Sequence, residues 1–260
     1  MKTTRSKDGT MLAYDTYGKG PALIFITGAT CFRSFAPVLH DAKVFAEEFT
    51  VYNYDRRGRG NSGNTMPYAM ERELEDIEAM IDVAGGRANI YGHSSGAILA
   101  LEATIRLGQK VKKLVMYDPA YSNDEANQEE FKALSQGLYR LLDSGKHDQA
   151  IRIFLEGIGT PKEVIMGMQQ SPQWETMVAL APTLAYDTTL ALDLPPVTRA
   201  ARLTTPTQII VGEESPTSIH DTANQLSKAI PNSAYFQLEG QDHMPNPEML
   251  LPVLSRFLKP

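Results

Sequence analysis

NIYGHSSGAILA, residues 89–100, places two serines between two glycines, after a short apolar run and before a second run rich in Ala and Leu. The five central residues fit the pattern G-x-S-x-G, with Ser94 in the middle. When a strand precedes this pattern and a helix follows it, the turn is strained and holds the central hydroxyl clear of the sheet. The stretch therefore favours Ser94 as a nucleophile over a serine that only caps a helix. In the same turn, the backbone N–H of Ser95 would face the place where negative charge develops.

Short apolar runs that end in Gly, Asp or Pro recur along the chain, and helical patterns separate them. The runs lie at residues 22–28, 49–55, 88–92, 113–119, 207–212 and 234–240, and the helical patterns at 68–83, 97–107, 221–230 and 248–258. Continuous runs of Val, Ile, Leu, Phe and Tyr are typical of strands buried on both faces of a parallel sheet. The alternation predicts an α/β fold, with a mostly parallel central sheet flanked by helices. A hairpin that turns at Asp8-Gly9 is expected before it.

The stretch 121–195 breaks this alternation, because it holds helical patterns and no clear strand. Its methionines and Trp174 give it an adaptable apolar surface. A helical insertion between two strands of a sheet is typical of a lid that excludes water, although it could also be additional core. We therefore expect a core in two parts, residues 1–120 and 196–260, with a helical cap at 121–195.

Several motifs, taken in their order, resemble the α/β-hydrolase superfamily almost from end to end. The resemblance rests on the N-terminal hairpin, ALIFITG (22–28) with the loop after it, YDRRGRGNSG (54–63), YGHSSG (91–96) and LEGQDHMPNPE (238–248). YDRRGRGNSG is similar to the D-x-R-G-x-G-x-S segment of that family, in which the glycines are turn residues. The resemblance implies the α/β-hydrolase fold with a helical cap. It also implies that His243, in the loop after the last strand, is the catalytic base that a serine nucleophile requires.

The acid that would orient the histidine is where the sequence departs from the family. Most relatives carry an Asp in the loop after the strand that corresponds to 207–212, and Ser215 stands there instead. The substitutes in this chain are Asp118, Glu213, Glu214 and Asp242. Asp118 ends the strand that follows the nucleophile, and some family members carry their acid at that place. We therefore predict Asp118 as the acid, with Glu213 or Glu214 as the alternative.

The loop after the first core strand, residues 27–31, corresponds to the family's oxyanion loop. That loop often reads His-Gly-x there, and the residue after the Gly donates its backbone N–H. By this resemblance Ala29 would donate together with Ser95, and each donor contributes about 2.7–4 kcal/mol to lowering the barrier. Thr27 replaces the usual His, a change that leaves the backbone donor intact.

Composition excludes several classes of partner. The net charge is −6 and RRGRG (56–60) is the only basic cluster, which argues against nucleic acid as a partner. Cys31 is the only cysteine, so no disulfide can form within the chain. We find no signal peptide and no run of about 18 apolar residues, so we expect a cytoplasmic protein without a membrane partner. No metal-binding or dinucleotide motif is present, and we expect no metal and no cofactor.

These observations predict a cofactor-free, carboxylesterase-like serine hydrolase that acts through an acyl-enzyme on a small to medium, largely apolar ester. On the same scaffold, acyl transfer, perhydrolysis, carbon–carbon hydrolysis and hydroxynitrile lysis are alternatives. A haloalkane dehalogenase or epoxide hydrolase is disfavoured, because those relatives carry Asp where this chain has Ser94. A non-catalytic homologue that binds a small molecule is the alternative from another class.

Overall fold

Eight strands form one sheet in the computed structural model, which describes residues 1–259. They are β1 (Lys2–Arg5), β2 (Met11–Tyr17), β3 (Ala22–Ile26), β4 (Thr50–Tyr54), β5 (Ala88–His93), β6 (Val111–Tyr117), β7 (Thr207–Gly212) and β8 (Ser233–Leu238). Their order in the sheet is β1-β2-β4-β3-β5-β6-β7-β8. The strands β1 and β2 form an antiparallel hairpin, and β2 pairs antiparallel with β4, whereas all other neighbours are parallel. The six apolar runs of the sequence are the six strands of the parallel part, as predicted.

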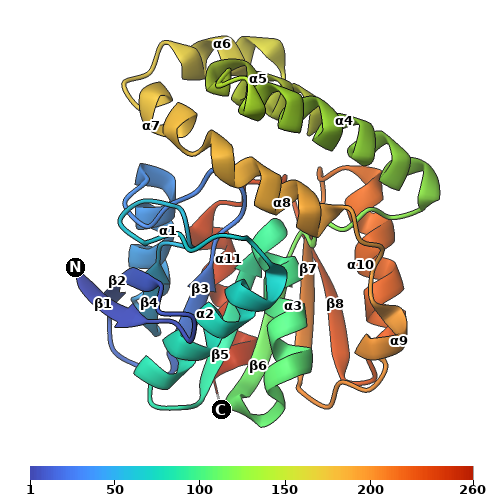
Figure 1. Cartoon of the computed structure of the whole chain (residues 1–260). Coiled ribbons are helices and arrows are strands. Elements are labelled where there is room, and N and C mark those ends of the chain that lie inside the picture. The colour runs from blue at the N-terminus through green and yellow to red at the C-terminus, as the bar shows by residue number, and fades with distance from the viewer. Residues whose placement is uncertain (260) are drawn as a thin grey trace.

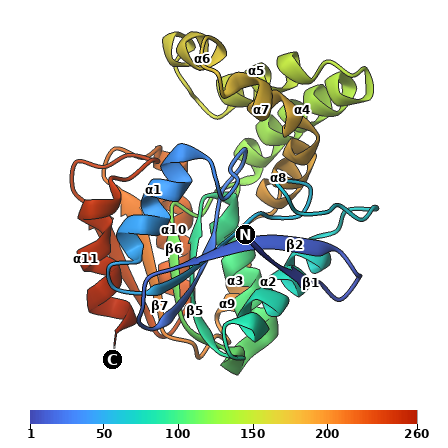
Figure 2. The same cartoon turned by 90° about the vertical axis from the view of Figure 1, so that its left-hand side faces the viewer.

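Helices cover both faces of this sheet (Figures 1 and 2). One face is covered by α2 (Met70–Val83), α3 (Ser95–Leu107) and α10 (Thr217–Ala229), and the other by α1 (Ala36–Phe45) and α11 (Pro247–Leu258). Shorter elements are η1 (Gly108–Lys110) and α9 (Val197–Ala200). The predicted helical patterns are α2, α3, α10 and α11. The sequence patterns did not predict α1, which begins after Phe35 without any side-chain cap and has Pro37 in its first turn.

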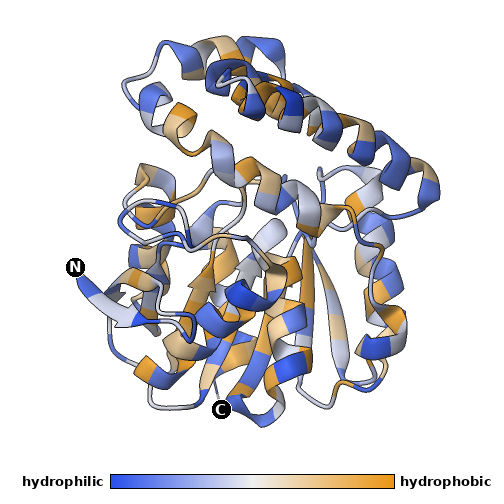
Figure 3. Cartoon of the chain, viewed as in Figure 1, coloured by the Kyte–Doolittle hydropathy of each residue, from blue (hydrophilic) through white to orange (hydrophobic). Residues whose placement is uncertain are grey.

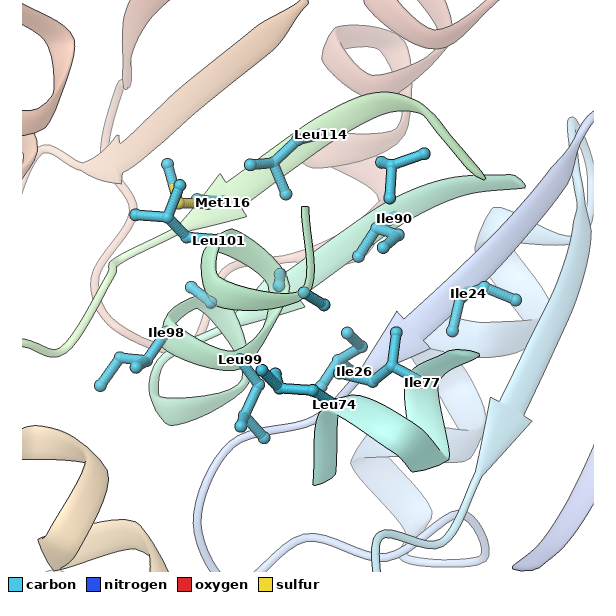
Figure 4. Packing of buried hydrophobic residues seen from close by; sticks show 14 of the residues in the cluster. Ile24, Ile26, Leu74, Ile77, Ile90, Ile98, Leu99, Leu101, Leu114 and Met116 are labelled. Carbon is cyan, nitrogen blue, oxygen red and sulfur yellow. The ribbon is translucent and has the colours of Figure 1, made fainter. Parts of the chain in front are cut away.

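The core between the sheet and the helices α2 and α3 is made of aliphatic side chains (Figure 4). The labelled residues are Ile24 and Ile26 of β3, Ile90 of β5, Leu114 and Met116 of β6, Leu74 and Ile77 of α2, and Ile98, Leu99 and Leu101 of α3. Figure 3 shows that the central strands are largely hydrophobic, whereas the outward surfaces of the helices are mostly hydrophilic. Removal of this apolar surface from water fixes α3 against β5. The packing therefore also fixes the turn between them, where Ser94 lies.

Residues 121–195, which we call the helical segment, contain no strand, as predicted. Their elements are α4 (Glu125–Asp143), α5 (His147–Gly157), α6 (Lys162–Gln169), α7 (Trp174–Ala179), η2 (Ala181–Thr183) and α8 (Leu184–Ala191). They lie beyond one end of the strands, above the core in both views, with α8 nearest to it (Figures 1 and 2). The segment has its own apolar cluster, which includes Leu138, Ile151, Phe154, Trp174 and Leu184. Among residues 1–259, no helix combines the length and the apolar character that crossing a membrane requires.

Candidate active site

Ser94 occupies a strained turn between β5 and α3, as G-x-S-x-G predicts. Its φ of 58° and ψ of −123° lie in a region that residues other than Gly rarely adopt. The flanking glycines are required by close packing. A Cβ at Gly92 would overlap the Gly96 carbonyl and Ala100, and a Cβ at Gly96 would overlap the Ile26 carbonyl. Strained residues cluster at functional sites. Thr30 follows β3 and Asp118 follows β6, the two strands next to β5, and both residues also have positive φ values.

Asp118 and His243 meet at the carboxyl ends of the strands, where Ser94 also lies, although 125 residues separate them in sequence. The Nδ1 atom of His243 lies 2.9 Å from Oδ2 of Asp118, whose side chain is completely buried. An Nδ1–H that donates to a carboxylate leaves Nε2 of the neutral ring unprotonated, ready to accept a proton. The His243 side chain is 35% exposed, so its ring remains accessible from outside the core.

The Asp118 carboxylate has two further donors that hold it in place. The backbone N–H of Gly212 donates to Oδ1 at 3.1 Å, and the hydroxyl of Ser215 donates to Oδ2 at 2.6 Å. Ser215, at the position where most relatives have their acid, is thus a hydrogen-bond donor to the carboxylate of the neighbouring strand.

The other carboxylates that the sequence offered have different contacts. Glu213 and Glu214 are exposed, and Glu213 accepts a hydrogen bond from the Gly240 N–H at 2.8 Å. Asp242 accepts from the Met244 N–H at 2.7 Å. Within residues 1–259, only Asp118 has a carboxylate hydrogen-bonded to the His243 ring.

His93 supports the loop that carries His243. Its Nε2 donates to the backbone carbonyl of His243 at 2.7 Å, and the two ring centroids are 5.0 Å apart. Burial, with a smaller contribution from the nearby His243, lowers the pKa of His93 to about 4, so the ring is neutral near pH 7. Nothing in the motif G-x-S-x-G pointed to this supporting role of His93.

The loop between β3 and α1 lies directly against Ser94. A Cβ added at Gly28 would stand 3.0 Å from Cβ and 3.5 Å from Oγ of Ser94. Ala29, the next residue, is half-buried. Ser95 is the first residue of α3, so its backbone N–H has no acceptor within the helix. Both predicted oxyanion donors therefore lie in segments that adjoin Ser94.

A buried network of arginines and carboxylates contacts the same loop, and no sequence pattern predicted it. Arg56 and Arg59 are almost completely buried, and both donate to Asp187 of α8, at 2.9 and 2.6 Å. Arg56 also forms two hydrogen bonds to Glu73 of α2, at 2.6 and 3.1 Å. Burial alone would raise the pKa of Asp187, but the charges of Arg59 and Arg56 outweigh it, and the pKa is lowered. The partners lie 128 and 131 residues from Asp187, so no local pattern reveals them.

Cys31 is buried, and burial raises the pKa of its thiol to about 11. It therefore behaves as a small apolar side chain rather than as a thiolate nucleophile. In the part of the chain that the structure describes, no three His, Cys, Asp or Glu side chains are grouped to hold a metal ion.

Comparison with known proteins agrees with the fold. A model of the alpha/beta hydrolase family matches residues 23–252. The crystal structure of an alpha/beta hydrolase from Sphaerobacter thermophilus is 39% identical and has a TM-score of 0.88, covering 99% of this chain and all of that one. A thermophilic esterase from Thermogutta terrifontis shares the fold, with a TM-score of 0.73, 17% identity and coverage of 100% and 98% of the two chains.

Among curated proteins, the uncharacterized hydrolase YraK of Bacillus subtilis is 29% identical over 115 residues. That match covers 43% of this chain and 42% of YraK. The matched part is thus less than half the length of that relative.

Proposed function

Because the chain belongs to the alpha/beta hydrolase family, we propose that it is a serine hydrolase that cleaves carboxylic esters without a cofactor. The observation that carries the proposal is the hydrogen bond between His243 and the buried Asp118, at the edge of the sheet where Ser94 stands in its strained turn. These three residue types in these roles make up the nucleophile, base and acid of acyl transfer.

The proposed reaction begins when Oγ of Ser94 attacks the ester carbonyl and Nε2 of His243 takes its proton. Asp118 holds the ring in the required tautomer and stabilises the imidazolium that forms. The carbonyl oxygen becomes an oxyanion, which accepts hydrogen bonds from the backbone N–H groups of Ala29 and Ser95. Collapse of this intermediate breaks the ester bond, and His243 returns the proton to the departing alcohol. A water molecule, deprotonated by the same ring, then attacks the acyl-enzyme, and the ring returns that proton to Oγ of Ser94 as the carboxylic acid leaves.

The apolar cluster of the helical segment supports two further proposals, that the substrate is small and largely apolar and that the segment is a cap. Its apolar cluster packs against Ala29, the proposed oxyanion donor. An acyl chain bound next to Ala29 would therefore meet apolar side chains of this cluster. Apolar walls around a few polar groups are typical of small-molecule sites. We accordingly propose that residues 121–195 form a cap over the reacting carbonyl.

The proposal is tested by hydrolysis of p-nitrophenyl esters from acetate to decanoate, with wild type, Ser94→Ala and the exposed control Ser144→Ala. We expect wild type and Ser144→Ala to release p-nitrophenol at equal rates. Ser94→Ala should lose roughly 10³-fold or more in kcat, because no covalent step remains. Equal rates in Ser94→Ala and wild type, or no hydrolysis of any of the esters by wild type, would reject the proposal.

A further inference from the structure

The side chain of Arg59 is tied to the loop that precedes α1. It is only 1% exposed. Its Nη1 donates to the carbonyl oxygens of Gly28, at 2.5 Å, and Cys31, at 3.3 Å, while its Nη2 donates to Asp187 at 2.6 Å. A guanidinium is a rigid planar fork, so these bonds fix the place of the loop relative to the arginine.

The Gly28 carbonyl and the Ala29 N–H belong to one peptide unit. In a planar trans peptide the C=O and the N–H point in opposite directions. A donor that holds the Gly28 oxygen therefore also sets the direction of the Ala29 N–H, which points away from Arg59. This peptide adjoins Ser94, because a Cβ at Gly28 would stand 3.0 Å from the Ser94 Cβ. The direction of the Ala29 N–H is thus tied to an arginine whose own hydrogen bonds go to Gly28, Cys31 and Asp187.

Asp187 connects this arginine to the second proposed donor. While its Oδ2 accepts from Arg59, its Oδ1 accepts from Arg56 at 2.9 Å and from the Ser95 hydroxyl at 2.8 Å. Arg56 in turn is within hydrogen-bond distance of the Thr27 carbonyl, at 3.3 Å. One carboxylate on α8 is therefore linked to both segments that carry the oxyanion donors. Arg56 and Arg59 balance the charges of Asp187 and Glu73, and removing one member would leave a buried charge uncompensated.

We propose that Arg59 is a positioning residue for the oxyanion hole, which sets the direction of the Ala29 N–H through the Gly28 carbonyl, and that Asp187 holds Arg59 in place. The proposal rests on the proposed serine hydrolase function and adds residues that touch neither substrate nor nucleophile. It gives the helical segment a part in assembling the site, because Asp187 lies on α8. Loss of Arg59 should weaken binding of the tetrahedral intermediate more than binding of the ester.

The test compares Arg59→Lys with Arg57→Lys. Arg57 is equally buried and forms two hydrogen bonds to Asp76, at 2.8 and 2.7 Å, together with one to Asp8 at 3.0 Å. Its Nη2 also donates to the Arg72 carbonyl of α2, and none of its hydrogen bonds reaches the loop of Gly28. Lysine keeps the charge at both positions but cannot span several acceptors as the guanidinium does. The two variants therefore make the same chemical change with and without a link to the oxyanion loop.

The measurements are kcat and KM for a p-nitrophenyl ester, the inhibition constant of phenylboronic acid, which forms a tetrahedral adduct with a serine nucleophile, and the thermal midpoint. We expect Arg59→Lys to lower kcat roughly tenfold to a hundredfold, less than complete loss of a donor, with KM within about twofold of wild type. The affinity for the boronic acid should fall by a similar factor. Arg57→Lys should change kcat by less than about twofold, even if its thermal midpoint falls by as much as that of Arg59→Lys.

Equal losses of kcat in both variants at a temperature where both are folded, or a loss confined to KM, would overturn the proposal. If Arg59→Lys does not fold, Asp187→Asn and its matched control Asp76→Asn, another buried aspartate paired with an arginine, replace the pair with the same expected outcomes. Wild type without Ser94-dependent hydrolysis would reject the proposed function itself. Ser94-dependent activity without the difference between the variants rejects only the role of Arg59.

Discussion

Replacement of Asp118 by Asn removes one charge from the proposed triad and leaves the shape of the side chain unchanged. Its Oδ1 faces the Gly212 N–H, and its Oδ2 faces both the Ser215 hydroxyl and Nδ1 of His243. A backbone N–H cannot turn into an acceptor, so the oxygen of an Asn would stay toward Gly212. The NH₂ group would then take the place of Oδ2, next to His243.

In that arrangement the Asn donates a hydrogen bond to Nδ1 of His243, and the single ring proton moves to Nε2. A ring protonated at Nε2 cannot accept the proton of Ser94. The corresponding loss of the correct tautomer in a Ser-His-Asp triad lowers kcat roughly 10⁴-fold. At 1.36 kcal/mol for each factor of ten, the barrier for Asp118→Asn should rise by about 5.4 kcal/mol.

The assay is steady-state hydrolysis of p-nitrophenyl butyrate, with Glu213→Gln and Glu214→Gln as controls, and thermal unfolding of each variant to show that it is folded. The activities of the two controls should stay within about threefold of wild type, because both glutamates are exposed and solvent screens their charges. The reasoning is refuted if folded Asp118→Asn keeps a tenth or more of the activity, or if either glutamine variant loses as much as Asp118→Asn.

Three further predictions follow from burial and packing. Burial lowers the pKa of His93 from 6.5 to about 4. The free energy of unfolding should therefore fall by roughly 3 kcal/mol as the pH falls from 6.5 to 4, because the unfolded chain takes up the proton first. Urea titrations at several pH values should show a weaker pH dependence for His93→Gln than for wild type, and equal pH dependence in the two proteins would contradict this prediction. Gly28→Ala should lower kcat while the protein stays folded, since the new methyl group would crowd Ser94, whereas Gly167→Ala, where a Cβ meets nothing within 4 Å, should leave kcat unchanged; equal kcat in the two variants would argue against this crowding. Iodoacetamide should not inactivate the native protein, because the Cys31 thiol is buried with its pKa raised to about 11; rapid inactivation would show that the thiol is exposed.

The fold could be predicted from the sequence where the pattern is local. A strand such as Thr207–Gly212, buried along its whole length, is recognisable as a continuous apolar run. Helix α1 gave a weaker signal, because Phe35 offers no capping side chain and Pro37 reads first as a turn residue. Its buried residues Val38, Ala42 and Phe45 do keep helical spacing, which is the pattern that could have revealed it.

The candidate site divides in the same way. Ser94 and its glycines form a local motif, so the sequence placed the strained turn correctly. Which carboxylate faces His243 depends on how strand ends meet in space, and the sequence therefore left Asp118 and the two glutamates open. The contacts of Asp187 were beyond sequence reasoning, because isolated charged residues are by default exposed and only the fold brings it to Arg56 and Arg59.

The most direct test of the proposed nucleophile is peptide mass spectrometry of the protein after treatment with a fluorophosphonate, which phosphonylates an activated serine. We expect a single adduct, on the peptide that contains Ser94, and none in Ser94→Ala. An adduct on another residue, or an unmodified wild-type protein, would show that Ser94 is not the activated nucleophile.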